Sequence, residues 1–367
     1  MRKSHALIGI AAIAGLAGGF TEACTVPVFR YALDHWPGDP YQLEAPEGWM
    51  ASQEAQTLRK LLDESRTEIR LQPLAETGAP ARLILPREGA VVWSGNLDEN
   101  AGDLFISPAR EEIAKRILSG ESMVWVMVTS GNEKADRELA QRMKTRLEYL
   151  QSVAAIPEQD PNDPESKLGP GPALRVGFSF LQVGHDDPTE QVFVRMLAGP
   201  HRELLELNPE TGERKPFGGV VFGRGRVLGA WPASSLDEEG LDEVSLFLLG
   251  ACSCRVKVQN PGWDLALALD WDEALQDAQM DYERNATEDS ASTGTEGAGG
   301  ASSVAGREAE VVLIGDGQDL GKGEQRPEAS SFKAHPAAGL LVGAVVALAG
   351  VFAWCCSRAG KSGIKGG

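Results

Sequence analysis

The feature that most constrains this chain is an apolar run near its carboxyl end, residues 337–355, which reads AAGLLVGAVVALAGVFAWC. The run has no charged residue, and its length is close to the ~20 residues that a helix needs to cross ~30 Å of hydrocarbon. Arg358, Lys361 and Lys365 follow it, and an excess of basic residues marks the cytoplasmic side of a span. The sequence therefore predicts a transmembrane helix over residues 337–355 and a basic cytoplasmic tail over residues 356–367.

The amino end has the order of an export signal. Arg2 and Lys3 precede an apolar run, and the small residue Ala23 follows it, as a charged n-region, an h-region and a cleavage site do in signal peptides. Residues 1–23 are therefore predicted to be removed, which leaves Cys24 as the first residue. Lipoprotein processing would add a lipid to that cysteine, but the residues before it lack the usual leucine, so ordinary cleavage is the preferred interpretation.

Together the two ends predict a single-pass protein of the bacterial inner membrane. The bulk of the chain is then on the extracytoplasmic side, in the periplasm, and the carboxyl end is cytoplasmic. Gly339, Gly343 and Ala347 form a stripe of small residues along the predicted span, and such stripes let two helices approach closely. A homo-dimer through the membrane helix is one expectation, although small residues are also common in unpaired spans.

The composition limits the partners. The formal charge is −18 at pH 7, and the sequence has no clustered basic face of the kind that binds nucleic acid by displacing counterions. A nucleic-acid partner is therefore not expected, and no residue pattern points to a cofactor. The remaining expectation is another envelope protein as the partner.

Residues 282–336 form a segment of different composition. Ser, Gly, Ala, Thr and Glu dominate it, as in TEDSASTGTEGAGGASS, and such a sequence buries too little apolar surface to offset the entropy of ordering. It is predicted to be a disordered spacer between the folded part and the membrane. The run EVVLIG at residues 310–315 interrupts it, and could either pair as a strand or remain a lone extended segment.

The region before the spacer alternates strand-like and helix-like segments, which predicts an α/β fold. A buried strand is expected at residues 124–128, and Asn132 is expected to cap a helix over residues 133–151 that carries one apolar face. Further along the chain, the sequence predicts a strand at 175–183, a helix at 188–198, a hairpin of strands at 217–222 and 226–231, and a helix opened by Ser235 and Glu238 and stopped by Gly250.

The order of these elements resembles the thioredoxin-like fold over residues 122–255. Pro216, just before the hairpin, matches the position of that family's cis-proline, and the run GVVFGRGRVLGAW resembles its hairpin and following glycine. At the end of the first strand, where the family carries Cys-x-x-Cys, this chain has Thr-Ser-Gly-Asn at residues 129–132. The resemblance therefore implies the fold without the dithiol that disulfide exchange requires.

The first half has the same plan in a weaker form. The sequence predicts a strand at residues 25–31, a helix at 53–64, a strand at 69–74, a hairpin within 82–94, and a closing helix begun by Ser107 and Pro108. Tandem thioredoxin-like units, residues 24–121 and 122–281, are therefore the predicted architecture. A single larger α/β sheet is the alternative.

Outside the predicted membrane span and its tail, the thiols are those of Cys24, Cys252 and Cys254. An odd count in an oxidising compartment leaves one thiol unpaired or joined to another molecule. The preferred interpretation is a structural disulfide from Cys24 to one member of the pair. Alternatively, Cys252 and Cys254 could exchange disulfides or bind a soft metal such as Cu(I), and no other metal site is expected.

No other residue pattern predicts catalysis. The histidines have no partner at metal-ligand spacing, and the folded region has no Gly-x-Ser-x-Gly nucleophile motif. The segments CTVPVFRYAL and CSCRVKVQNPGWDLAL resemble uncharacterised bacterial envelope proteins, which implies a location and no activity. The expected function is a membrane-anchored, non-catalytic binding or scaffolding role. The alternative is an envelope thiol-disulfide oxidoreductase or a Cu(I)-binding protein that uses Cys252 and Cys254.

Overall fold

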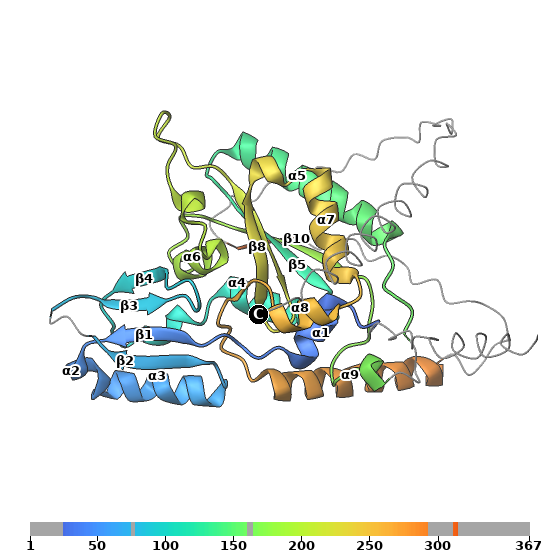
Figure 1. Cartoon of the computed structure of the whole chain (residues 1–367), viewed down its shortest axis with the longest axis horizontal. Coiled ribbons are helices and arrows are strands. Elements are labelled where there is room, and N and C mark those ends of the chain that lie inside the picture. The colour runs from blue at the N-terminus through green and yellow to red at the C-terminus, as the bar shows by residue number, and fades with distance from the viewer. Residues whose placement is uncertain (1–24, 75–77, 160–163, 293–310, 315–367) are drawn as a thin grey trace, which may run out of the picture. The chain divides into compact units, whose positions relative to one another are not determined.

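The computed structural model describes residues 25–74, 78–159, 164–292 and 311–314 (Figure 1). They all belong to one compact unit, Met1–Gln318. They form a mixed α/β protein with a four-stranded and a six-stranded sheet. The predicted α/β class is confirmed, and the alternative of a single larger sheet is wrong.

Several predicted features lie outside the described residues. These are the signal peptide with Cys24, most of the spacer, and the membrane span with Gly339, Gly343 and Ala347. No helix in the described part of the chain is long and apolar enough to cross a bilayer. The export signal and the membrane helix therefore stay predictions.

The smaller sheet consists of the strands β1 Tyr41–Ala45, β2 Ile69–Pro73, β3 Ala81–Ile84 and β4 Val91–Gly95. Their order is β2-β1-β3-β4. β1 pairs in parallel with β2 and antiparallel with β3, which pairs antiparallel with β4. The sequence analysis missed β1, although every second residue of this strand is buried, as in a strand with one face towards a core. Between β1 and β2 lie the short helix α2 (Glu47–Met50) and the predicted helix α3 (Gln53–Glu64).

The described chain begins with a helix, α1 (Val28–His35), where the sequence predicts a strand at residues 25–31, so that prediction is wrong. Pro27 still forms an isolated antiparallel bridge to Ala251. Tertiary packing decides the element, because the buried apolar residues recur at helical rather than alternating spacing. These residues are Val28, Phe29, Ala32 and Leu33.

The larger sheet consists of β5 Met123–Val128, β6 Phe178–Val183, β7 Phe217–Phe222, β8 Arg226–Pro232, β9 Trp263–Asp264 and β10 Val311–Ile314. Their order is β10-β6-β5-β7-β8-β9. β5 is parallel to β6 and antiparallel to β7, and β7 and β8 form the predicted hairpin. β10 pairs in parallel with β6, so the run at residues 310–315 contains a paired strand.

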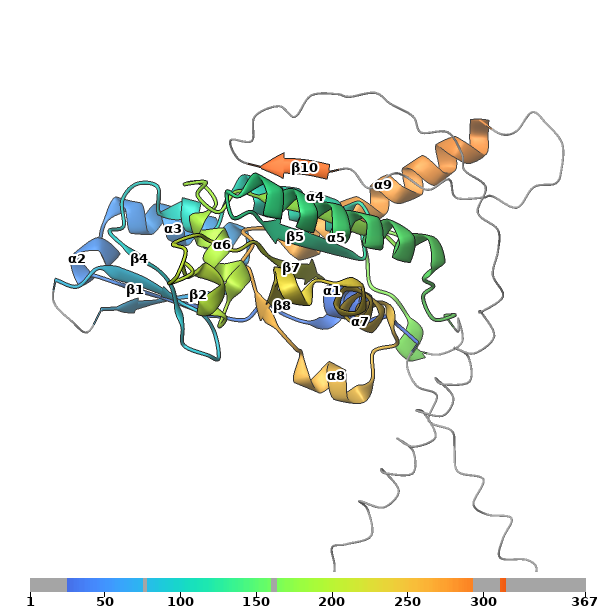
Figure 2. The same cartoon turned by 90° about the horizontal axis from the view of Figure 1, so that it is seen from above.

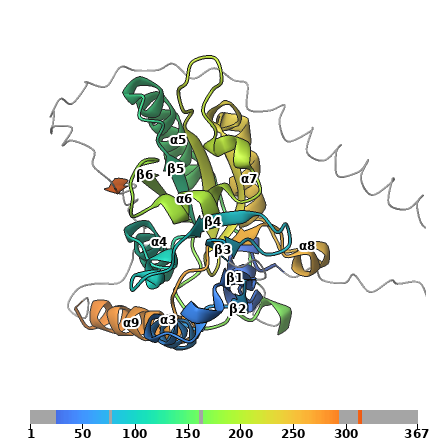
Figure 3. The ribbon, with the colours of Figure 1, turned by 90° about the vertical axis from the view of Figure 1, so that its left-hand side faces the viewer.

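Helices cover both faces of the larger sheet. The covering helices are α4 Pro108–Leu118 and α6 Gln191–Ala198 on one face, and α5 Glu133–Val153 and α7 Glu238–Leu249 on the other. The chain also has α8 Cys254–Gln259 and α9 Trp271–Ser292, with short 3-10 turns at Ala101–Leu104, Pro164–Ser166, Arg202–Leu205 and Ala233–Ser235. α5 and α7 lie side by side (Figure 3). Alternate residues of β5 enter two separate cores: Met123, Trp125 and Met127 pack with α5 and α7, whereas Val124, Val126 and Val128 pack with α4 and α6.

The second of these cores also contains the smaller sheet. Tyr41 and Leu43 of β1 belong to the same cluster as Val124 of β5. The helix α4, which the sequence assigns to the first unit, contacts β5 and β6 of the larger sheet. A boundary at residues 121 and 122 therefore does not separate two independent cores, because the apolar face of α4 is buried against the second sheet.

Two predicted helix starts had different outcomes. The Asn132 side chain accepts a hydrogen bond from the Ala135 N–H at 3.2 Å and caps α5, as predicted. α7 is capped by Asp237, whose side chain accepts from the Gly240 N–H at 2.9 Å. The prediction of Ser235 as the cap is wrong, because that residue belongs to a 3-10 turn before the helix.

The end of α9 corrects the predicted start of the spacer. The sequence analysis ends the folded part at residue 281, but α9 continues without a break to Ser292. In Figure 2 the carboxyl end of α9 lies away from both sheets. A helix does not need a core at every turn. The prediction of disorder, which was based on polar composition, is therefore wrong for residues 282–292.

Candidate functional site

The loop after β5 is the segment in which the sequence analysis looked for a dithiol and found Thr-Ser-Gly-Asn at residues 129–132. The carboxylate of Asp136, in the first turn of α5, accepts hydrogen bonds from the Ser130 N–H at 2.8 Å, the Ser130 hydroxyl at 2.8 Å and the Gly131 N–H at 3.0 Å. Asp136 is buried. The backbone donors of this loop are therefore used by the chain itself, and the loop holds no sulfur atom that could attack a disulfide.

Pro216 lies beside this loop. Val128 at the end of β5 pairs with Phe217, the residue after the proline. The described residues contain no cis peptide bond, so the prediction of a cis-proline is wrong. The trans form of a bond before proline is favoured by about 0.5–1 kcal/mol unless tertiary contacts select the other form.

The predicted cysteine pair is split between two environments. Cys252 is buried, whereas Cys254 carries an exposed free thiol at the first residue of α8. The Cys252 N–H donates to the Val26 carbonyl at 2.8 Å, which places the amino-terminal segment beside the pair. Cys24 itself lies outside the described residues, and in the described part of the chain no group of three His, Cys, Asp or Glu side chains is placed to hold a metal ion.

A chain of alternating charges that runs from the exposed Arg87 to the buried Asp264 joins the two sheets, and sequence reasoning missed it. Arg87 contacts Asp39 at 2.9 Å, Asp39 contacts Arg226 at 3.1 Å, and Arg226 contacts Asp264 at 3.3 Å. The Asp264 carboxylate also accepts a hydrogen bond from the Asp39 N–H. Burial raises the pKa of the Asp264 carboxyl to about 7, although Arg226 acts in the opposite direction.

This charge chain is suited to holding the sheets together. Arg226 is 2% exposed, and its guanidinium also donates to the carbonyls of Asn260, Pro261 and Gly262 at 2.8–2.9 Å. A cavity of about 180 Å³ opens onto the two carboxylates, which is less than the roughly 300 Å³ at the lower end of small-molecule sites. The Arg226 guanidinium binds both carboxylates and three backbone carbonyls. Because its donors are all used in this way, the arrangement is a structural joint rather than an acid–base pair.

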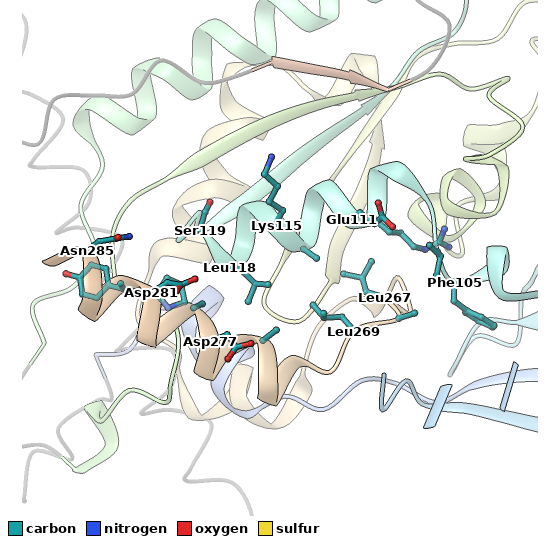
Figure 4. A pocket seen from close by; sticks show the side chains of 18 residues that line it. Phe105, Glu111, Lys115, Leu118, Ser119, Leu267, Leu269, Asp277, Asp281 and Asn285 are labelled. Atoms are coloured by element: carbon teal, nitrogen blue, oxygen red, sulfur yellow. The ribbon is translucent and has the colours of Figure 1, made fainter. Parts of the chain in front are cut away.

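A groove between α4 and α9 has a volume of about 800 Å³ (Figure 4). Leu118 of α4 points towards α9, and Leu267 and Leu269, from the segment before α9, lie between the two helices. Apolar lining with few polar groups is typical of binding sites of this size. The groove is therefore the best candidate for a binding site in this part of the chain.

The α9 side of the groove is acidic, and the positive charge at the bottom of the groove is neutralised. Asp277 and Asp281 line it from α9. Lys115 of α4 also lines it, but its ammonium group points away from α9 (Figure 4). Arg110 at the base of the groove is 2% exposed and donates to the Ser107 hydroxyl at 3.2 Å.

The charge of Arg110 is balanced inside the protein. The Ser107 hydroxyl donates to the fully buried Glu190 carboxylate at 2.7 Å, and the Ala109 N–H donates to the same carboxylate at 2.7 Å. Burial lowers the pKa of Arg110 to about 10, and Glu190 acts against that shift. The charge that the groove presents to a ligand is therefore negative and comes chiefly from α9.

The sequence analysis did not find this groove, because it predicted no helix at residues 271–292. The available signal was the recurrence of small and acidic residues from Ala274 to Asn285 at helical spacing. Comparison of the sequence with known proteins assigns no family, because no family model and no curated protein matches it. A function has to be inferred from the fold and the geometry of the site.

Proposed function

We propose that this chain is a membrane-anchored bacterial envelope protein with a non-catalytic, thioredoxin-like binding role. The element order from β5 to α7 supports the fold, since it runs strand, helix, strand, helix, hairpin, helix. The smaller sheet has a strand, a helix, a strand and a hairpin followed by α4, and β2 and β3 have no described helix between them. It is the weaker copy in this proposed tandem.

The proposal of a non-catalytic role rests on the loop at residues 129–132, which has no thiol and is held by hydrogen bonds to Asp136. Disulfide exchange requires a thiolate that attacks a disulfide sulfur. In this chain the loop at the end of β5 presents Ser130 and Gly131, and both are hydrogen-bonded to Asp136. The preserved element order without the reacting sulfur favours a fold used for binding.

The location follows from the two ends of the sequence. A cleaved signal peptide over residues 1–23 and a membrane helix over residues 337–355 would hold the folded part on the extracytoplasmic side. A chain anchored in this way searches only the volume within its reach, which raises the effective concentration of partners in the same membrane. We propose another envelope protein as the partner and the groove between α4 and α9 as its site.

Insulin reduction tests the non-catalytic role. The full-length protein, purified in a non-ionic detergent, is expected to leave the rate of insulin precipitation by dithiothreitol unchanged. The variant carrying Cys252→Ser and Cys254→Ser serves as the matched control and should behave in the same way. A catalytic rate that disappears in the double variant would overturn the proposal.

A second candidate function is favoured by one observation, the free and exposed thiol of Cys254 two residues from Cys252. Thiols at this spacing can exchange disulfides or bind Cu(I). Thiol counting with and without reductant measures the first property, and Cu(I) titration measures the second. Either alternative requires a signal that is lost when Cys252 and Cys254 are replaced by serine.

A further inference from the structure

The groove is bounded by one continuous face of each helix. On α9 the lining residues recur at helical spacing from Ala274 to Asn285, and on α4 they do so from Arg110 to Ser119. At 1.5 Å per residue the α9 wall is roughly 17 Å long, or about three turns. Two helix faces that run along an apolar gap of this length have the shape of a site for a third helix.

The groove side of α9 is only partly covered by the described residues. Trp271 and Leu275 anchor its first turns and are 8% and 1% exposed. Beyond them, Tyr282, which lines the groove, is 52% exposed. Since most helical stability in proteins comes from packing of an apolar face, a ligand that covers the later turns would stabilise α9.

The charge of the groove selects the ligand. Asp277 and Asp281 stand on its α9 wall, Lys115 points away from that wall (Figure 4), and Arg110 is neutralised by Glu190 through Ser107. The whole chain carries −18 at pH 7, which attracts cations at long range. A basic partner therefore has a favourable contact at the groove and favourable steering towards it.

From these observations we infer that the α4–α9 groove binds a basic amphipathic helix of a partner protein. The inference rests on the proposed binding role and names the class of partner. The apolar stripe of the bound helix contacts Leu118, Leu267 and Leu269, and Lys or Arg residues beside that stripe face Asp277 and Asp281. Such binding is the helix-in-groove mode of peptide recognition, with anchors at i, i+3, i+4 and i+7.

The test uses a defined peptide as the probe. A fluorescein-labelled helix of about 14 residues carries Leu and Ala at the anchor positions and Lys elsewhere, and a matched peptide carries Glu in place of Lys. Fluorescence anisotropy is measured with the full-length protein in a non-ionic detergent. The Lys peptide is expected to bind at least about tenfold more tightly than the Glu peptide and to weaken as salt screens the charges.

Two sets of variants on α9 locate the binding site. Asp277→Lys with Asp281→Lys is expected to weaken the Lys peptide by about tenfold or more, and Ala278→Trp, which fills the groove, is expected to abolish binding. The matched control is Glu273→Lys with Glu283→Lys, which makes the same change in net charge on the same helix outside the groove. The control should keep the affinity within about twofold.

The outcomes are distinguishable. Equal binding of the two peptides, equal effects of the two double variants, or no binding of the Lys peptide would each overturn the inference. If the groove is filled by another segment of this chain or by a second copy, the peptide does not bind, and the inference fails. A failed peptide test together with a negative insulin test leaves the proposed function intact, whereas insulin reduction removes the proposed function whatever the peptide does.

Discussion

Two pairs of helices pack side by side, α5 with α7 and α4 with α9, but only the first pair is closed. Arg146 of α5 contacts Asp242 at 2.5 Å and Glu238 at 2.8 Å on α7, and Leu147 beside it is buried in the common core. In the part of the chain that the structure describes, no ion pair joins α4 to α9. A groove of about 800 Å³ separates them.

The difference comes from the side chains that face each other. α5 and α7 present large apolar residues and opposite charges, which fill the space between two helices. α9 presents Ala274 and Ala278 with Asp277 and Asp281. The alanines are too small to fill the space between the helices, and the aspartates are too polar to pack against Leu118 on α4. The closed pair therefore belongs to the stable core, and the open pair is where a ligand can add contacts.

The largest expected effect lies in the closed pair. Leu147→Ala removes a side chain that is 2% exposed and leaves a cavity, so the free energy of unfolding is expected to fall by about 2–5 kcal/mol. Leu118→Ala, in the half-buried wall of the open pair, should cost less, because part of that side chain is already in water. Urea denaturation of both variants measures the difference, and equal losses would break the comparison.

The next effect concerns Asp264, which contacts Arg226 in the structural joint between the two sheets. The pKa of Asp264 is raised to about 7 by burial, whereas an exposed aspartate has a pKa of about 3.9. Between these two values the folded protein holds a proton that the unfolded chain has lost. This group therefore makes the free energy of unfolding fall as pH rises from about 4 to about 7, by up to about 1.4 kcal/mol per pH unit.

Asp264→Asn tests this pH dependence, because asparagine keeps the neutral form at every pH. The difference in the free energy of unfolding between the variant and the unmodified protein should grow in favour of the variant as pH rises through this window. Denaturation at several pH values measures it. A difference that does not change with pH would show that Asp264 is ionised in the folded protein throughout.

The smallest expected effect is again in the closed pair. Arg146→Ala removes the ion pairs to α7, but the Arg146 side chain is 21% exposed and Glu238 is 72% exposed. Partly solvated pairs contribute about 1 kcal/mol or less, so only a small loss of stability is expected. Faster hydrogen exchange in α7 would be its clearest sign, and a loss as large as that of Leu147→Ala would mean that charge, rather than packing, closes this pair.

Much of the larger sheet could be predicted, because its signals are local. The apolar run of β5, the Asn132 cap of α5 and the hairpin of β7 and β8 each depend on residues a few positions apart, and the structure has all of them. The groove could not be predicted in the same way. Leu118 and Asp281 are brought near each other only by the packing of α4 and α9.

The wrong predictions have the same cause. The segment at residues 25–31 has apolar residues that fit either period, and contacts made by α1 select the helix. The helix α9 continues through residues whose composition is typical of a spacer. In both places local composition was compatible with more than one structure. At α1, contacts with distant parts of the chain decided between them, whereas residues 282–292 continue a helix whose first turns are buried.

By itself the sequence determined the α/β class, most of the helices and strands of the larger sheet, and the absence of a thiol after β5. It also predicts the export signal and the membrane helix from which the proposed location follows. Only the tertiary structure decided that both sheets share a core, that Asp39 and Asp264 meet at Arg226, and that α9 leaves a groove beside α4. The physical reason is range: periodicity and capping act over one or two turns, whereas these contacts join residues that are distant in the chain and become neighbours only when the core is packed.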